Sequence, residues 1–212
     1  MVEAACACSE RVAGTNQRDR RREAILDAAE ALFLEQGFER TSLAQVVGQS
    51  RGSLATLYEL FGNKQGLLHA IAARWRDEAV SEDSDAPQGL SNAQMLRLFA
   101  RRQLAKMNSP RSIALMKMVF SESLRDSDFA AQTYRDLHLP VLEELTALFT
   151  EWTAAGGASI DAPDAAARYF LSLTAGDSVL GRLFGVEEGH MAEEEVDWRV
   201  DKFLDQFEIA RR

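Results

Sequence analysis

The stretch from Ile25 to Leu68 reads ILDAAEALFLEQGFERTSLAQVVGQSRGSLATLYELFGNKQGLL, and it decides the fold. Apolar residues recur in it at helical spacing as far as Phe33. Gly37 can then adopt the left-handed conformation that commonly ends a helix. These features predict a first helix over about residues 17–36, with one apolar face turned toward a core.

Two further helices follow at the spacing of a helix-turn-helix. Ser42 and Gln45 have the spacing of a capping box and begin the second helix. Gly52 offers a turn position with few steric limits, and Ser53 is a good N-cap for a short third helix over residues 54–60. A tight turn of this kind lets the second of two helices lie in the major groove of DNA. The stretch therefore predicts a DNA-binding unit.

The rest of the chain is also expected to be helical, because no stretch alternates polar and apolar residues and the four prolines fall at boundaries or bends. We expect a disordered leader over residues 1–16, a DNA-binding domain over 17–63, and a ligand-binding and dimerisation domain over 64–212. The predicted fold is all-α, with three N-terminal helices followed by six. Those six are expected at about residues 63–81, 91–107, 111–125, 128–155 with a bend at Pro140, 164–184 and 193–210.

The composition, 46% hydrophobic and 27% charged, is ordinary for a globular protein. No apolar run approaches the roughly 18 residues of a membrane span. The N-terminus lacks the basic start and apolar stretch of a secretory signal, so we expect a cytoplasmic protein. Cys6 and Cys8 are either reduced thiols on a disordered leader or part of a metal or redox site, for which the chain offers no further cysteine.

The charge distribution is compatible with nucleic acid, although the net charge is −9. Residues 1–64 hold 8 Lys/Arg and 9 Asp/Glu, whereas the remaining residues hold 16 basic and 24 acidic ones, so the acidic excess lies in the C-terminal part. Phosphate binding depends on the local charge, and four arginines cluster over residues 18–22. The basic arm around Arg11–Arg22 either follows DNA or is a solvated charge run.

With these elements in place, the first part of the chain resembles the DNA-binding domain of the TetR family of bacterial transcriptional regulators. The family pattern is carried by Gly37-Phe38, Thr41-Ser42, the segment SLATLYELF over residues 53–61, and Lys64, without gaps. The turn departs from it, because this chain has Ser50-Arg51-Gly52 where the family usually has Ala-Gly-Val. Moving the glycine by one residue is expected to alter the turn and to expose Arg51 to DNA.

The remaining two thirds resemble the regulatory half found in the AcrR/AefR-like branch of that family. The segments SIALMKMVFSES, DFAAQTYRD and DAAARYFLSLTAGDSVLGRLFG support this likeness. The resemblance implies a homodimer that binds an operator and responds to a small molecule. It supports the architecture and says little about the ligand.

Residue chemistry indicates which side chains contact DNA. Tyr58, Thr41 and Lys64 can reach phosphates, whereas base reading falls to Thr56 and Arg51. The alternative is that Thr56 is a packing residue, Tyr58 a half-buried wall and Lys64 an ordinary solvated lysine. The candidate DNA-binding residues are Thr41, Arg51, Ser53, Leu54, Ala55, Thr56, Tyr58 and Lys64.

Apolar stripes on the last two predicted helices indicate a four-helix dimer interface around a two-fold axis. Such a dimer can place two recognition helices about 34–36 Å apart, in successive major grooves of a palindromic site. The candidate interface residues are Phe170, Leu173, Leu180, Phe184, Val200, Phe203 and Phe207.

Methionine and aromatic residues between the DNA-binding domain and these stripes are candidates for an effector cavity, because they adapt to varied apolar ligands. For each of them a role in the core is the competing interpretation. The candidate pocket residues are Trp75, Phe99, Met116, Phe120, Tyr134 and His138.

The sequence therefore predicts a ligand-responsive DNA-binding transcriptional regulator. We expect a repressor that binds a palindromic operator as a dimer and is released by a small apolar molecule. Three histidines and two cysteines show no metal spacing, and we find no phosphate loop or nucleophile motif, so we expect neither catalysis nor a cofactor. The expected partners are double-stranded operator DNA, a second copy of the chain and an unidentified effector, with no membrane. The alternative is a helical small-molecule binding or interaction module whose DNA binding is weak or lost.

Overall fold

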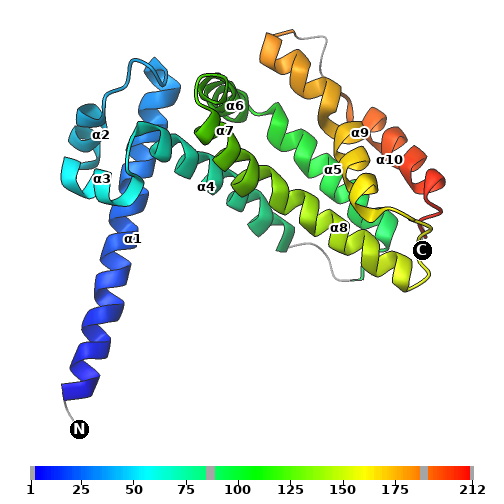
Figure 1. Cartoon of the computed structure of the whole chain (residues 1–212), viewed down its shortest axis with the longest axis horizontal. Coiled ribbons are helices and arrows are strands. Elements are labelled where there is room, and N and C mark those ends of the chain that lie inside the picture. The colour runs from blue at the N-terminus through cyan, green and yellow to red at the C-terminus, as the bar shows by residue number, and fades with distance from the viewer. Residues whose placement is uncertain (1–2, 85–88, 187–190, 211–212) are drawn as a thin grey trace. The chain divides into compact units, whose positions relative to one another are not determined.

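The computed structural model describes residues 3–84, 89–186 and 191–210, and it confirms the predicted all-α fold (Figure 1). These described residues form ten α-helices and one π-helical turn, and no strand. They divide into two compact units, residues 1–72 and 73–212. Among the described residues, no helix has the length and apolar character needed to cross a membrane.

The first unit contains α1 (Glu3–Gln36), α2 (Leu43–Ser50), α3 (Leu54–Phe61) and the start of α4 (Lys64–Ser84). Side-chain caps fix where these helices begin and end. Ser42 and Gln45 form the predicted capping box, and Ser53 caps α3. Asn63 accepts a hydrogen bond from the first turn of α4, and Gly37 follows α1 with φ +88°. The predicted helix boundaries therefore rest on local chemistry that the structure reproduces.

Two limits differ from those expected from the sequence. Helix α1 begins at Glu3 and so runs through most of residues 1–16, where the sequence predicts a disordered leader. Alanines in this stretch favour a helix, but it contains no Leu, Ile or aromatic residue that could anchor it in a core, and its disorder stays a prediction. The units divide after Ala72 rather than after residue 63, because Leu67, Leu68 and Ile71 of α4 are fully buried outside the C-terminal core cluster.

The second unit continues with α5 (Asn92–Asn108), α6 (Pro110–Ser123), α7 (Ser127–Thr133), the π-helical turn η1 (Tyr134–His138), α8 (Leu139–Ala154), α9 (Pro163–Phe184) and α10 (Glu193–Gln206). Helices α5, α8, α9 and α10 enclose its core. The rings of Phe149, Phe170 and Phe203 are fully buried there, with centroids 5.0–6.3 Å apart. Edge-to-face and tilted packing of this kind stabilises the core beyond the burial of area.

A π-helical turn replaces the single bent helix that we expected over residues 128–155. Pro140 has no N–H, so it cannot donate to the carbonyl of Asp136, four residues earlier. Arg76 of α4 donates its Nη1 to that carbonyl instead. The sequence correctly indicates a bend at the proline, but the bend takes the form of one π-helical turn between α7 and α8.

Two ion pairs tie α10 to α5. Arg97 pairs with Asp201, and Arg101 pairs with Asp197 through two hydrogen bonds, of which the one from Nε to Oδ1 measures 2.9 Å. The hydrogen bond from Arg101, together with its positive charge, holds the pKa of Asp197 below its ordinary value. The carboxylate of Asp197 is therefore stabilised in its charged form.

The Arg101–Asp197 pair predicts a pH-dependent contribution to stability. The contribution is complete above the pKa of an unfolded aspartate, about 3.9, and is lost as the pH falls through the lower pKa of folded Asp197. We expect Asp197→Asn to lower the free energy of unfolding by about 0.5–1 kcal/mol at pH 7, since the pair is bidentate but partly exposed. Denaturant unfolding at pH 7 and pH 3 measures this. The difference from wild type should shrink at pH 3, and the exposed Asp161→Asn should show neither effect.

Candidate nucleic-acid interface

One side of α3 is exposed along its whole length. Leu54 is 43% exposed and Tyr58, one turn later, is 52% exposed, with Ala55 and Glu59 beside them. On the opposite side Leu57 is completely buried and holds the helix against its unit. A helix of eight residues with one anchored face and one free face has the form of a recognition helix.

The turn before α3 differs from the one expected. Arg51, not Gly52, adopts the left-handed conformation, with φ +54° and ψ +32°, and its N–H caps α2 by donating to the Val47 carbonyl. Gly52 lies where the space for a side chain is limited. A Cβ atom there would lie 3.3 Å from Ser50 Oγ and 3.9 Å from Ile25 Cδ1. The glycine therefore serves close packing, while the arginine carries a strain of about 1 kcal/mol.

The hydroxyl groups of Ser53 and Thr56 form hydrogen bonds within the first turn of α3. Ser53 Oγ accepts a hydrogen bond from the N–H of Thr56 at 3.1 Å, and the two hydroxyl oxygens lie 2.9 Å apart. Both residues thus fix the start of α3. Thr56 is half-buried, which leaves its hydroxyl less available for base reading than we expected.

Thr41 has to be removed from the candidate DNA-binding residues. Its side chain is 2% exposed, and its hydroxyl donates toward the carbonyls of Gly37 and Leu32 while Gln36 donates to it. These contacts close the turn between α1 and α2. The sequence pattern marks Thr41 for a structural reason: it replaces the hydrogen bonds that the end of α1 leaves open.

Lys64 also has a role inside the unit. Its Nζ donates to the Glu39 carbonyl at 3.1 Å and lies 4.4 Å from the centre of the Phe38 ring. This contact fastens the first turn of α4 to the turn after α1. It also explains why a lysine can stand at a helix start, where the helix dipole disfavours a cation.

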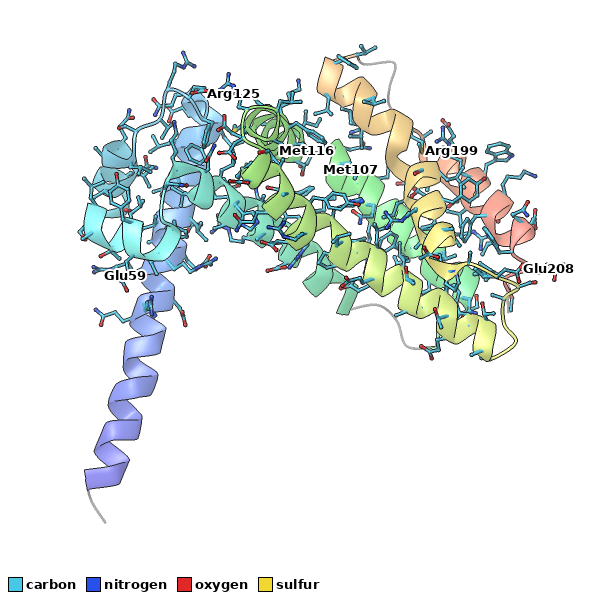
Figure 2. All side chains as sticks on the ribbon, in the orientation of Figure 1. Glu59, Met107, Met116, Arg125, Arg199 and Glu208 are labelled. Carbon is cyan, nitrogen blue, oxygen red and sulfur yellow. The ribbon has the colours of Figure 1, made fainter. Side chains whose placement is uncertain are left out.

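The arginine cluster of α1 lies beside α3. Arg18 Nη2 lies 3.2 Å from Oε1 of Glu59 on α3, and the two residues form an ion pair (Glu59 is labelled in Figure 2). Arg22 lies 5.8 Å from the centre of the Phe61 ring, while Arg20 and Arg21 are exposed. The basic residues are therefore next to the exposed face of α3. Cys6 and Cys8 lie where side chains are not described.

The candidate pocket residues do not gather in one place. Trp75 is half-buried and donates its Nε1–H to Ser112 Oγ at 2.9 Å, and Met116 follows one turn later on α6. Phe99 is half-buried and packs against Phe170, 6.0 Å between centroids, beside the core of α8, α9 and α10. These three positions are compatible with a cavity wall, but the described contacts assign them to two different clusters.

The other three pocket candidates are exposed, and their place in a cavity wall stays a prediction. Phe120 is on the outer side of α6, and the rings of Tyr134 and His138 stack at 5.1 Å in the π-helical turn. Partial loss of hydration and the positive charge of Arg168 lower the pKa of His138.

The candidate dimer residues divide between the core and the surface. Phe170, Val200 and Phe203 are fully buried within the subunit, so they are unavailable to a partner, and Leu173 and Phe207 are half-buried. Leu180 and Phe184 are exposed, by 54% and 80%. An apolar stripe shows that a helix face is covered, but it does not say whether its own subunit or a second one covers it.

Several residues of interest were not singled out from the sequence. Tyr169 and Trp198 are large exposed side chains on α9 and α10, and helical spacing from Leu180 and Phe184 could have identified Tyr169. Arg182 is buried on α9 and donates its Nη1 to the carbonyl of Met107, labelled in Figure 2; burial lowers its pKa. No local pattern in the sequence distinguishes it from a surface arginine.

Comparison with known proteins supports this description in both units. Residues 25–71 match the family model for bacterial regulatory proteins of the tetR family, and residues 94–210 match the model for the C-terminal domain of AefR-like transcriptional repressors. A 61-residue segment is 45% identical to the HTH-type transcriptional repressor ComR of Escherichia coli (strain K12). That match covers 29% of this chain and 29% of ComR.

Solved structures share the fold over nearly the whole chain. A TetR-family transcriptional regulator from Mesorhizobium loti has a TM-score of 0.75 over 90% of this chain and 98% of its own, and at 20% identity this likeness shows the fold alone. The flavonoid-responsive regulator FrrA has a TM-score of 0.68 and 28% identity over 92% of this chain and 100% of its own. The tetR-family match spans α2, α3 and the first turns of α4, and the AefR-like match spans α5 to α10. The chain therefore belongs to the TetR family of bacterial transcriptional regulators, with an AefR-like C-terminal domain, and it regulates transcription rather than catalysing a reaction.

Proposed function

We propose that this regulator is a repressor that binds a palindromic operator as a homodimer and leaves it when a small apolar molecule binds the C-terminal unit. The observation that carries the DNA-binding part is the exposed face of α3, anchored by Leu57 and started by the Ser53 cap. Because its partner is bacterial DNA, we also propose that it acts in the cytoplasm.

The proposed DNA-contacting surface consists of Arg51, Leu54, Ala55 and Tyr58, flanked by the arginine cluster of α1. The Tyr58 phenol can donate to a phosphate, while Leu54 and Ala55 can contact thymine methyl groups. Lys64 contributes mainly by holding the turn after α1, and its ammonium group can donate to a nearby phosphate as well. Ser53 and Thr56 contribute by fixing the first turn of α3.

The proposed dimer face is a row of exposed or half-exposed residues along α9: Tyr169, Leu173, Gly176, Leu180 and Phe184. Their spacing of three or four residues follows one side of the helix. A Cβ atom at Gly176 would meet nothing within 4 Å, so a second helix could approach closely there. Exposed rings of this size are costly in water, and covering them against a second copy would remove about 25 cal/mol per Å² of that cost.

The proposed effector is a small apolar compound, and similarity to FrrA, a flavonoid-responsive regulator, favours an aromatic one. Trp75 and Met116 are half-buried at the Trp75–Ser112 contact, which joins α4 to α6. An aromatic ligand could stack on such residues while a polar group binds nearby. It would release DNA by favouring another conformation of the dimer.

The first prediction concerns DNA. We expect specific binding to a selected operator with a steep loss of affinity as salt rises, because phosphate contacts release counterions. Tyr58→Phe should raise the Kd about 3–10-fold, the effect of losing one solvent-exposed hydrogen bond of about 1 kcal/mol. Fluorescence anisotropy measures both. The control is Tyr134→Phe, an equally exposed tyrosine of the C-terminal unit, which should leave the Kd unchanged. Absence of salt-dependent binding to any DNA would favour the binding-module alternative.

The second prediction concerns the dimer. Phe184→Asp should convert the protein to a monomer in analytical ultracentrifugation, since it places a charge where an apolar ring would be covered. Affinity for the full operator should fall at least 10-fold with it. Leu124→Asp provides the matched control, because Leu124 is 89% exposed directly after α6, outside the α9 row. A dimeric Phe184→Asp protein would contradict the proposed face.

The third prediction concerns the effector. In a panel of small aromatic compounds that includes a flavonoid, a compound that raises Tm should also raise the Kd for operator about 5–150-fold, the usual range of allosteric coupling. Met116→Gln should weaken the Tm shift, whereas Met95→Gln, which packs against the other core cluster, should keep it. A compound that saturates the protein without releasing operator would rule it out as the inducer and would argue against the proposed coupling.

A further inference from the structure

Arg51 stands out in the N-terminal unit because its backbone is unfavourable for its side chain. It occupies the left-handed region with φ +54°, which L residues other than glycine, asparagine and aspartate rarely adopt. Within the described part of the chain, only Glu208 is another non-glycine residue with positive φ. Glycine at position 51 would make the same turn without strain, so the arginine side chain is the feature to be explained.

The guanidinium group of Arg51 is exposed, and among the described residues no carboxylate or carbonyl accepts a hydrogen bond from it. Three other cations of the same unit have partners within it: Arg18 with Glu59, Arg40 with the Gln36 carbonyl, and Lys64 with the Glu39 carbonyl. Arg51 therefore has five N–H donors that the folded unit does not use. A strained residue with an unused side chain points to a role outside the protein.

The neighbouring recognition helix lacks such donors. Near its start, Leu54 and Ala55 have no polar side-chain atoms, and the hydroxyls of Ser53 and Thr56 are occupied with each other. Arg51 precedes the N-cap of α3 by two residues. It therefore lies at the N-terminal end of α3, and the N-terminal residues of a recognition helix are those that contact base edges. The fork of an arginine matches the O6 and N7 atoms of guanine, the commonest specific contact in a major groove.

We propose that Arg51 is the principal base-reading residue of this regulator and that it selects a guanine in each operator half-site. This inference rests on the proposed DNA-binding function and adds the residue and the base on which its specificity depends. The left-handed strain of Arg51 is then the structural cost of placing an arginine next to the base edges. Tyr58 and the α1 arginines position α3 on the DNA backbone, and Arg51 discriminates guanine from the other bases.

The experiment is selection from a random double-stranded DNA library with wild-type protein, Arg51→Gly and Arg51→Lys, followed by Kd measurements on single-base variants of the selected site. We expect wild type to require a guanine at one position of each half-site and to lose about 10–100-fold in affinity when it is replaced. Both variants should lose that preference while keeping the others. Lysine retains the charge but not the fork, so Arg51→Lys separates base reading from attraction to phosphate.

Arg51→Gly also has a readout that does not involve DNA. Relief of the left-handed strain should raise Tm by about 2–4 °C, which shows that loss of the preference does not come from unfolding. Arg40→Ala, an exposed arginine of the same unit, should retain every base preference.

Two results would overturn the proposal in different ways. If wild type selects an operator and both Arg51 variants select it with unchanged preferences, Arg51 does not read a base. In that case a uniform loss of affinity in Arg51→Gly, with the salt slope reduced by about 1, would assign Arg51 to a phosphate, and Arg51→Lys should keep the slope because it keeps the charge. If wild type selects no DNA sequence at all, the proposed function fails, and the role of Arg51 fails with it.

Discussion

The turn between α2 and α3 is the constraint on which the DNA-binding surface depends. It must connect α2 to α3 within three residues, close α2 through the N–H of Arg51 and start α3 through the hydroxyl of Ser53. Gly52 can satisfy the packing requirement because it has no Cβ to meet Ser50. The left-handed conformation is then left to Arg51. A local conflict between backbone and side chain therefore lies next to the face of α3 that the unit leaves exposed, as is common where a structure has been shaped for recognition.

The C-terminal unit has to divide its apolar surface between its own core and other molecules. Phe149, Phe170 and Phe203 form a continuous aromatic core, and removing one such ring would cost about 3–5 kcal/mol. The ion pairs at Arg97 and Arg101 lie at the edge of this core, where water weakens them, so they orient α10 more than they stabilise it. Among the side chains that stay exposed, those of the row on α9 that ends at Phe184 share one side of a single helix.

Helix α4 connects these two regions along the chain, because the division between the units falls within it. Its C-terminal half is held in the second unit by polar contacts. Trp75 donates to Ser112 and accepts from Lys106 through its carbonyl, and Arg76 donates to the carbonyl that Pro140 leaves open. Because Pro140 has no N–H, the Asp136 carbonyl can accept a hydrogen bond from Arg76 of another helix. The backbone between α7 and α8 forms the π-helical turn at this place.

Much of the N-terminal unit follows from the sequence alone, because caps, turns and helical periodicity act over a few residues: Gly37, Ser42, Gln45 and Ser53 each stand where their local chemistry predicts. The roles of Thr41 and Lys64 were beyond sequence reasoning, since a hydroxyl or an ammonium group can serve a carbonyl of its own chain as well as a phosphate. The apolar stripes likewise identified α9 and α10 as helices with one covered face. Only the tertiary structure showed that the subunit itself covers Phe170, Val200 and Phe203 and leaves Leu180 and Phe184 exposed. Local interactions are encoded by neighbours in the chain, whereas the choice of a packing partner depends on which distant segments compete for the same surface.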